Sequence, residues 1–238
     1  YFRMLLDGEA AVPRRGMGAI PAQLAEGLDL RLNCRVERLE PHAEGVRVHG
    51  PGSVFQAAQV IVATEGPELS RLTGVAAPTS GVGSTYLDFA ADNQLDPEPR
   101  LLLNARGGWL VNNAVWRSTL VPELAPPGQH LLTVTVLGVP ETSDGALEAT
   151  VRAELSQWYG AAAGGLRLLR VTRVPFAQFP QPPGFSKHLL GHATPLPGVL
   201  IASEATAMSG IQGALGSGET AAAIVLDDTA GMARPRGG

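Results

Sequence analysis

Two short apolar runs that lie far apart in the chain constrain its fold more than any other feature. Residues 59–63 (QVIVA) and 199–203 (VLIAS) are each almost continuously apolar, without the alternation of a half-exposed strand. Continuous runs of this length are typical of strands that are buried on both faces of a parallel sheet. We therefore expect an α/β chain in which the first and last segments share one α/β domain and the segment between them is inserted.

The segment between these runs has a different pattern. Its apolar residues alternate or form short blocks separated by Gly, Pro and Asn, which predicts strands near 82–90, 100–105, 108–116, 130–138 and 166–179. Between residues 147 and 158 apolar residues recur at helical spacing, and Ser143 or Asp144 can cap this helix. We expect a mostly antiparallel layer at residues 80–184, and a discontinuous α/β domain at 1–79 and 185–238.

The outer segments contain further signals. Pro21 and Gly27 bracket a short helix at about 20–27. Two strands joined at 42–45 (HAEG) and a third strand at 53–58 follow, and then a short helix at 66–74. The chain ends with the strand at 199–203 and a helix at 210–226.

Charge and cysteine content exclude several classes of protein. The net charge is −4, so the chain offers no basic surface for nucleic acid. The single cysteine, Cys34, excludes an internal disulfide, and His188 and His192 lie in a Pro-rich loop without a nearby carboxylate, so we expect no metal site. No apolar run approaches the roughly 20 residues of a membrane span, and no signal segment is visible, so we expect a cytoplasmic protein.

The residues after the second apolar run are unusual. Glu204 stands alone at the expected carboxyl end of a strand, where open α/β sheets bind ligands. From 204 to 210 only Met208 is bulky and apolar, and a helix N-terminus follows, which favours anionic or carbonyl groups. A carboxylate here suits paired hydroxyls such as those of a ribose or ribityl chain. Alternatively, Glu204 caps the helix and the small residues serve close packing; spacing alone leaves both interpretations open.

The stretch at 198–222 (GVLIASEATAMSGIQGALGSGETAA) is similar to the C-terminal FAD-binding signature of the flavin-containing amine oxidase and phytoene desaturase superfamily. That signature is a strand, Gly-Asp or Gly-Glu, a short loop and a Gly-Ala-x-x-Ser-Gly helix. The resemblance implies that Glu204 holds the ribityl chain of FAD and that the N–H of Ile211 points at a flavin carbonyl. Ser203 stands where the family usually has Gly. The remaining cofactor-binding positions that the signature implies are Gly210, Gly213 and Ala214.

A second stretch, residues 16–64, is similar to the middle segment of the same family. There a Gly-Met-Gly turn leads into a helix, and a strand pair follows whose valine holds the adenine through its backbone. The resemblance implies that Val36 is this valine. It also implies a partial FAD-binding α/β domain at 1–79 and 185–238, with an inserted substrate-binding domain at 80–184. Residues 111–116 (VNNAVW) further resemble phytoene-desaturase-like oxidoreductases.

Two departures from the family pattern affect the expected function. The Gly-x-Gly-x-x-Gly turn that holds the FAD diphosphate is absent, so the chain resembles the later part of such an enzyme and is expected to be truncated. The strand at 83–89 (GSTYLDF) lacks the lysine that amine-oxidising members carry, and Gly210 stands where their substrate cage has an aromatic residue. Amine oxidation is therefore not expected.

The resemblance implies the C-terminal portion of an FAD-dependent oxidoreductase that takes a hydride or two electrons from an apolar small molecule. FAD is expected to bind without a covalent link, and no catalytic residue is assigned. Tyr86, Trp109 and Trp116 are candidates for an apolar substrate pocket, although core packing explains them equally well. A homodimer would cover the sheet edge that the missing segment leaves. The alternative is a non-catalytic fragment or degenerate paralogue that binds no flavin and acts through protein contacts.

Overall fold

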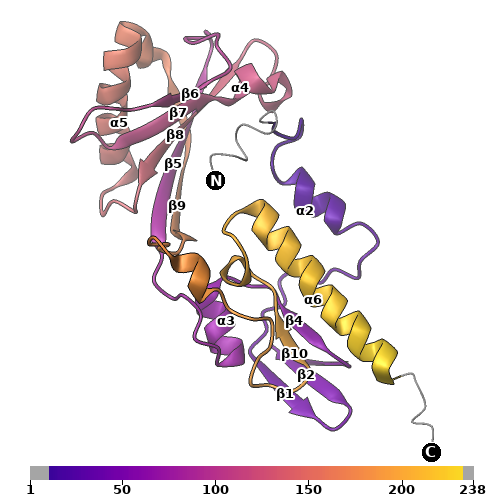
Figure 1. Ribbon diagram of the computed structural model, residues 1–238. Coiled ribbons are helices and arrows are strands. Elements are labelled where there is room, and N and C mark those ends of the chain that lie inside the picture. The colour runs from indigo at the N-terminus through magenta and orange to yellow at the C-terminus, as the bar shows by residue number, and fades with distance from the viewer. Residues whose placement is uncertain (1–10, 233–238) are drawn as a thin grey trace, which may run out of the picture. The chain divides into compact units, whose positions relative to one another are not determined.

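The computed structural model describes residues 11–232, which form two compact units (Figure 1). The sheet unit contains residues 11–30 and Val82–Gln178, and the junction unit contains Arg31–Gly81 and residues 179–232. Helices and strands make up 31% and 29% of the residues, which confirms the expected mixed α/β class. Residues 11–30 thus pack with the inserted segment, and the assignment of flavin or substrate to either unit stays a prediction.

Five antiparallel strands form the centre of the sheet unit, in the order β6-β7-β8-β5-β9. The strands are β5 (Val82–Ala91), β6 (Leu101–Leu103), β7 (Val111–Trp116), β8 (His130–Leu137) and β9 (Arg167–Gln178). The strands that alternation predicted are therefore confirmed. Alternation also decides which side chains are buried, because Leu87 and Phe89 on β5 point to one face while Tyr86 and Asp88 point to the other.

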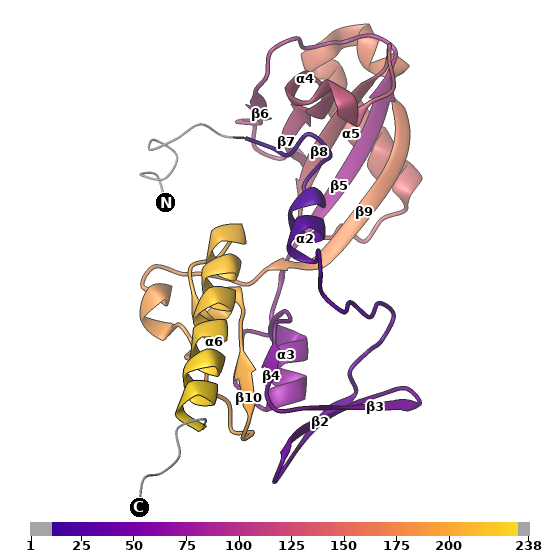
Figure 2. The same cartoon turned by 90° about the vertical axis from the view of Figure 1, so that its right-hand side faces the viewer.

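The amphipathic helix α5 (Asp144–Tyr159) covers one face of this sheet (Figures 1 and 2). Ser143, one of the two caps that the sequence allowed, is its N-cap, because its side chain accepts a hydrogen bond from the N–H of Ala146 in the first turn. Leu147, Val151 and Leu155 are fully buried against the sheet. Each such side chain stabilises the fold by about 1.5–3 kcal/mol, so this face forms the main core of the sheet unit.

Helix α5 also anchors the start of β7. Both carboxylate oxygens of Glu154 accept hydrogen bonds from backbone N–H groups, those of Leu110 and Val111, each at 2.9 Å. The 3₁₀ turn η2 (Gly160–Gly165) then joins α5 to β9. The remaining elements of the unit are α2 (Ala19–Leu24), α4 (Arg117–Leu120) and the 3₁₀ turn η1 (Pro122–Leu124). Helix α2 is shorter than the predicted helix at 20–27.

The junction unit contains a three-stranded antiparallel sheet and one parallel pair. The antiparallel strands are β1 (Arg38–His42), β2 (Gly45–Gly50) and β3 (Ser53–Ala57), and the parallel pair is β4 (Val60–Val62) with β10 (Val199–Ile201). The helical elements are α3 (Gly66–Thr73), η3 (Phe185–His188), η4 (Glu204–Thr206) and α6 (Ile211–Met232). Figures 1 and 2 both show α6 beside the β4–β10 pair.

The two distant apolar runs, which the sequence predicts to be strands of one α/β domain, pair with each other in parallel as β4 and β10. The predicted burial on both faces is wrong for the first run, since Val62 is 5% exposed but Ile61 is 38% exposed. Successive side chains of a strand point to opposite faces. Within residues 11–232, β4 and β10 are the two strands of their sheet, Leu200 of β10 also bridges Ala193, and Ile61 on β4 stays partly exposed.

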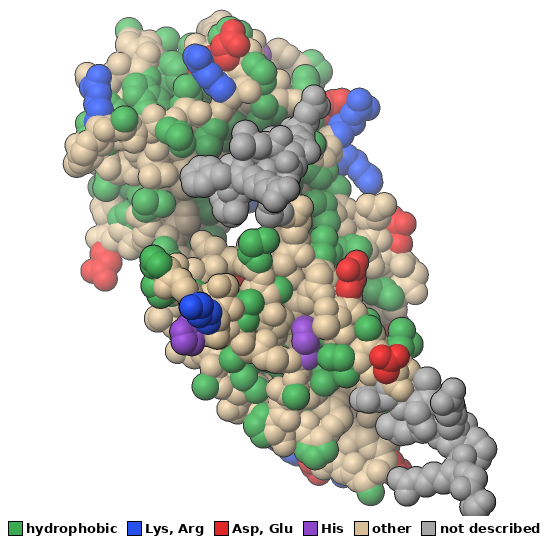
Figure 3. All heavy atoms as spheres, viewed as in Figure 1, with side chains coloured by type: hydrophobic (Ala, Val, Ile, Leu, Met, Phe, Trp, Pro, Cys, Tyr) green, Lys and Arg blue, Asp and Glu red, His purple; other side chains and the backbone are tan. Residues whose placement is uncertain are grey.

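Charged side chains are scattered over the face shown in Figure 3 rather than gathered in one patch. Among the described helices, none is both long and apolar enough to cross a lipid bilayer. His, Cys, Asp and Glu side chains within residues 11–232 form no group of three or more that could hold a metal ion.

Candidate functional site

The parallel strand pair positions Glu204. The N–H of Ala202 donates to the carbonyl of Val62 at 3.0 Å, which extends the pairing past the carboxyl ends of both strands. Ser203 then caps η4, because its Oγ accepts a hydrogen bond from the N–H of Ala205 at 3.0 Å. The backbone of Ser203 is extended, with a φ of −157°, so this position does not require the glycine of the family signature.

Glu204 has one carboxylate oxygen engaged and one available. Its Oε2 accepts a hydrogen bond from the hydroxyl of Ser209 at 2.7 Å, while its Oε1 accepts none from the described residues. The side chain is half-buried. An ionised carboxylate oxygen in this state can accept hydrogen bonds from hydroxyl groups of a ligand. No described N–H of α6 donates to this carboxylate, so Glu204 does not cap α6 in the way that the alternative interpretation required.

Gly213 allows the loop after Glu204 to pack closely on α6. A Cβ at this position would lie 1.4 Å from the carbonyl oxygen of Met208, and Gly213 is buried. The hydroxyl groups of Thr206 and Ser217 lie 2.6 Å apart and tie the same loop to the next turn of the helix. The missing side chain of Gly213 therefore serves packing within the chain.

The beginning of α6 is accessible. Gly210 has a φ of +120°, in the region that favours glycine, and no atom lies within 4 Å of the place of its Cβ. Ile211 is 52% exposed, and Ala214 is exposed as well. The N–H of Ala214 donates to the carbonyl of Gly210 at 3.0 Å, and the N–H groups before it have no acceptor inside the helix. This helix end therefore presents donors and a partial positive charge.

Val36 lies just before β1 and is joined to α3. Its carbonyl accepts a hydrogen bond from Nη2 of Arg71 at 2.7 Å, and the carbonyl of Glu37 accepts one from Nη1 at 2.6 Å. Arg71 is itself held by Glu68, and the hydrogen bond from Arg71 lowers the pKa of that carboxyl. The carbonyl of Val36 is thus engaged within the chain, whereas its N–H makes no hydrogen bond with the described residues.

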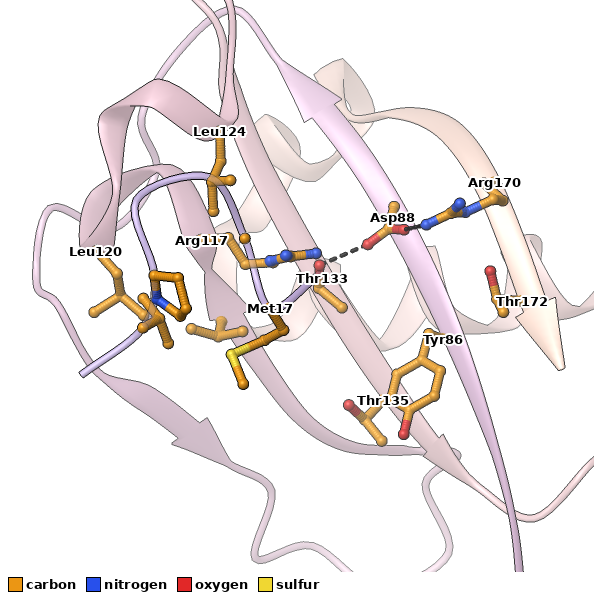
Figure 4. Close-up of a pocket in the computed structure, with 14 residues that line it drawn as sticks. Met17, Tyr86, Asp88, Arg117, Leu120, Leu124, Thr133, Thr135, Arg170 and Thr172 are labelled. Atoms are coloured by element: carbon orange, nitrogen blue, oxygen red, sulfur yellow. Dashed lines mark hydrogen bonds and ion pairs between the residues drawn. The ribbon is translucent and has the colours of Figure 1, made fainter. Parts of the chain in front are cut away.

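A cavity of about 460 Å³ lies on the face of the sheet opposite α5 (Figure 4). Side chains of β5, β7, β8 and β9 form its floor, and residues 12–17 with the α4–η1 turn form its wall. Nε of Arg14 lies 3.1 Å from Oε1 of Glu123, and this ion pair links the segment at residues 12–17 to η1. The apolar side chains of the cavity include Val12, Met17, Val115, Leu120 and Leu124, and the hydroxyl groups include those of Tyr86, Thr133, Thr135 and Thr172.

Three charged side chains of the described residues line this cavity. Asp88 is 7% exposed; its Oδ1 accepts a hydrogen bond from the hydroxyl of Thr133 at 2.6 Å, and its Oδ2 pairs with Nη2 of Arg170 at 3.0 Å (Figure 4). Arg117 is the first residue of α4, and its guanidinium makes no ion pair or hydrogen bond with the described residues. The cavity therefore combines apolar walls with one ion pair, Asp88–Arg170, and one unpaired cation, Arg117.

The three aromatic candidates for a substrate pocket are not brought together. Tyr86 lines the 460 Å³ cavity. Trp116 is 2% exposed on the α5 side of the sheet, where its Nε1 donates to the hydroxyl of Tyr159 at 3.1 Å. Trp109 lines a separate pocket of about 170 Å³ and packs on Trp158, with ring centroids 6.3 Å apart.

The sequence reasoning missed the charged residues of the cavity. Asp88 and Thr133 carried a usable signal, because they share the alternation of Tyr86 and Thr135 and so had to point to the same face of the sheet. Arg117 follows β7 directly and begins a four-residue helix, so no periodicity marks it.

Comparisons with known proteins agree with this architecture. A family model described as flavin containing amine oxidoreductase matches residues 1–226. No curated protein sequence matches the chain. A solved structure from Exiguobacterium sp. 255-15, assigned as a protoporphyrinogen oxidase, is 16% identical in sequence, with a TM-score of 0.65. The match covers 90% of this chain and 52% of the chain in that structure. A redesigned putrescine oxidase is 17% identical in sequence, with a TM-score of 0.62, and the match covers 89% of this chain and 53% of the oxidase chain.

Cyclohexylamine oxidase from Brevibacterium oxydans IH-35A is 14% identical with a TM-score of 0.59, over 90% of this chain and 53% of its own. At such identities the likeness shows the fold, and function has to be argued from the site. The chain spans about half the length of these three structures.

Proposed function

Because the chain belongs to the flavin containing amine oxidoreductase family, we propose that it supplies the flavin-contacting and substrate-binding part of an FAD-dependent oxidoreductase. The observation that carries this proposal is the state of Glu204. Ser209 holds one oxygen of its carboxylate, and the other oxygen is available at the carboxyl end of a parallel strand pair. Ligands of open α/β sheets bind at such strand ends.

The residues of the junction unit at and after Glu204 are suited to hold a flavin. The available oxygen of Glu204 can accept hydrogen bonds from ribityl hydroxyl groups. The N–H of Ile211, at the accessible start of α6, can donate to a flavin carbonyl, and Gly210 leaves space for a flat ring. When bound, the flavin supplies the two-electron redox chemistry, and the residues of this chain bind and orient it.

The proposed substrate is an apolar small molecule bound in the cavity of the sheet unit. The cavity volume of about 460 Å³ lies within the range of about 300–1,000 Å³ that small-molecule sites occupy. No acid or base is assigned, because Asp88, the one carboxylate that the described residues contribute to the cavity lining, is engaged by Thr133 and Arg170. Amine oxidation is not proposed, since β5 has no lysine.

The test is FAD retention after mixing and desalting, read from the visible absorption spectrum. Glu204→Gln is expected to weaken FAD binding about tenfold or more, since hydrogen bonds to a charged group contribute about 1.5–3 kcal/mol and each 1.4 kcal/mol is a factor of ten. Glu219→Gln removes the same charge from an exposed position of the same helix and should leave FAD affinity unchanged. Equal affinities in the two variants would contradict the ribityl role of Glu204.

The hydrogen bond from Arg71 to the carbonyl of Val36 favours a second candidate, a non-catalytic module that binds no flavin. This carbonyl belongs to the residue proposed to hold the adenine, and Arg71 already occupies it. If that contact alone blocks the adenine, Arg71→Gln should restore FAD binding to a chain that is colourless in its wild-type form. Failure of both forms to retain FAD would support the module.

A further inference from the structure

The chemistry of the cavity in the sheet unit is more specific than that of an apolar pocket. Among residues 11–232, its lining contains one carboxylate and two guanidinium groups, those of Asp88, Arg117 and Arg170. The fixed charge that these described residues bring to the lining is therefore +1. A ligand that fills the cavity has to match this charge as well as the apolar walls.

The negative charge of Asp88 is already neutralised. Both of its carboxylate oxygens are engaged, one by the hydroxyl of Thr133 at 2.6 Å and the other by Arg170 at 3.0 Å. The Asp88 side chain is 10% exposed, whereas that of Arg170 is 68% exposed, so the pair is held at the cavity floor with Arg170 reaching it from the solvent side. A cationic ligand would have to displace Arg170 in order to reach this carboxylate.

The positive charge of Arg117 is not neutralised by the described residues, although its backbone is held firmly. The residue before it, Trp116, is 2% exposed in the core, and the residue after it, Ser118, is buried and accepts a hydrogen bond from the N–H of Leu131 at 2.9 Å. The guanidinium is directed toward the part of the sheet that carries Thr133 (Figure 4). Arg117 is therefore a preorganised cation in a partly apolar cavity.

From these contacts we infer that the cavity binds an apolar molecule carrying one carboxylate, which pairs with the guanidinium of Arg117. A neutral ligand would strip water from an unpaired cation without replacing its hydrogen bonds, which is unfavourable. A carboxylate fits the planar fork of arginine, and a single negative charge balances the lining, whereas a dianion would leave one charge beside Asp88 uncompensated. The identification of this ligand as the substrate rests on the proposed function, but its binding can be measured without flavin.

The test compares two probes of equal chain length, decanoate and decan-1-ol, by isothermal titration calorimetry of the full chain without FAD. Decanoate is expected to bind at least about tenfold more tightly than decanol, which is the scale of a hydrogen-bonded charge pair. Arg117→Gln should abolish this preference, and Arg117→Lys should restore part of it. Arg106→Gln is the matched control, because Arg106 lies over Trp109 outside the cavity and its loss changes the net charge equally.

Three results would overturn the inference: equal affinities of the wild-type chain for the two probes, no binding of either probe, or an unchanged preference in Arg117→Gln. The first two need no variant, so they decide the matter even if Arg117→Gln does not fold. FAD retention of the same preparations separates this inference from the proposed function. A chain that selects decanoate through Arg117 but retains no FAD supports the inference and contradicts the flavin proposal. A chain that retains FAD but does not select decanoate supports the flavin proposal and contradicts the inference.

Discussion

The close contact between Gly213 and the backbone of Met208 makes Gly213→Ala the most informative substitution in this chain. The added Cβ would lie 1.4 Å from the Met208 carbonyl oxygen, whereas ordinary contact begins at about 3.4 Å, so helix and loop have to separate by about 2 Å. The obstacle is backbone, and no flexible side chain can yield. Overpacking costs about 1–3 kcal/mol, and a displacement of this size belongs at the upper end.

The higher helix propensity of alanine returns up to about 1 kcal/mol, which leaves a net loss of about 2 kcal/mol. For a chain of this size a net loss of about 2 kcal/mol lowers the Tm by about 4–8 °C. Hydrogen exchange of residues 199–226 should accelerate in the variant, because the loop that carries Glu204 separates from α6. Far-ultraviolet circular dichroism and exchange mass spectrometry measure these two effects.

Two controls make the result decisive. Gly216→Ala lies on the same helix, where nothing comes within 4 Å of the new Cβ, so it should stabilise the chain by up to about 1 kcal/mol. All three tryptophans belong to the sheet unit, so tryptophan emission should be the same in both variants and in the wild type. If Gly213→Ala raised the Tm as Gly216→Ala does, the packing argument for Gly213 would be refuted.

Three further predictions concern the caps and charges of the two units. Ser143→Ala removes the N-cap of α5 and should lower the free energy of unfolding by about 1 kcal/mol in urea titrations followed by tryptophan emission. Glu154→Gln weakens two hydrogen bonds to the start of β7 and should cost about 1–2 kcal/mol in the same titrations. The pKa of Glu40 is lowered from 4.5 to about 2 by hydrogen bonds from Arg38 and His49. The stabilisation by this carboxylate is therefore present above pH 4.5 and is lost as the pH falls toward 2, so the stability difference between wild type and Glu40→Gln should disappear over that window in acid titrations.

Most of the fold that the sequence predicts follows from the periodicity of its apolar residues. Alternation over two residues predicted the strands of the antiparallel sheet, and helical spacing after a capping Ser143 or Asp144 predicted α5. These signals are local, because a strand or an amphipathic helix can bury one face only if its apolar residues recur at the period of that element. The composition of the two apolar runs also predicted that they are strands of one domain, although it predicted neither their direct pairing nor the exposure of Ile61.

The sequence by itself therefore determined the elements, the mixed class, the family resemblance and the place of Glu204 after a strand. Only the tertiary structure decided which groups meet: Ser209 with one oxygen of Glu204, Met208 over Gly213, and Arg71 on the carbonyl of Val36. The tertiary structure also places Trp116 in the core and Tyr86 in the cavity. In that cavity, Arg117 forms no ion pair with the described residues. The physical reason is that these contacts join segments through loops of irregular backbone, where no repeat period relates one residue to another and where packing in three dimensions decides the neighbours.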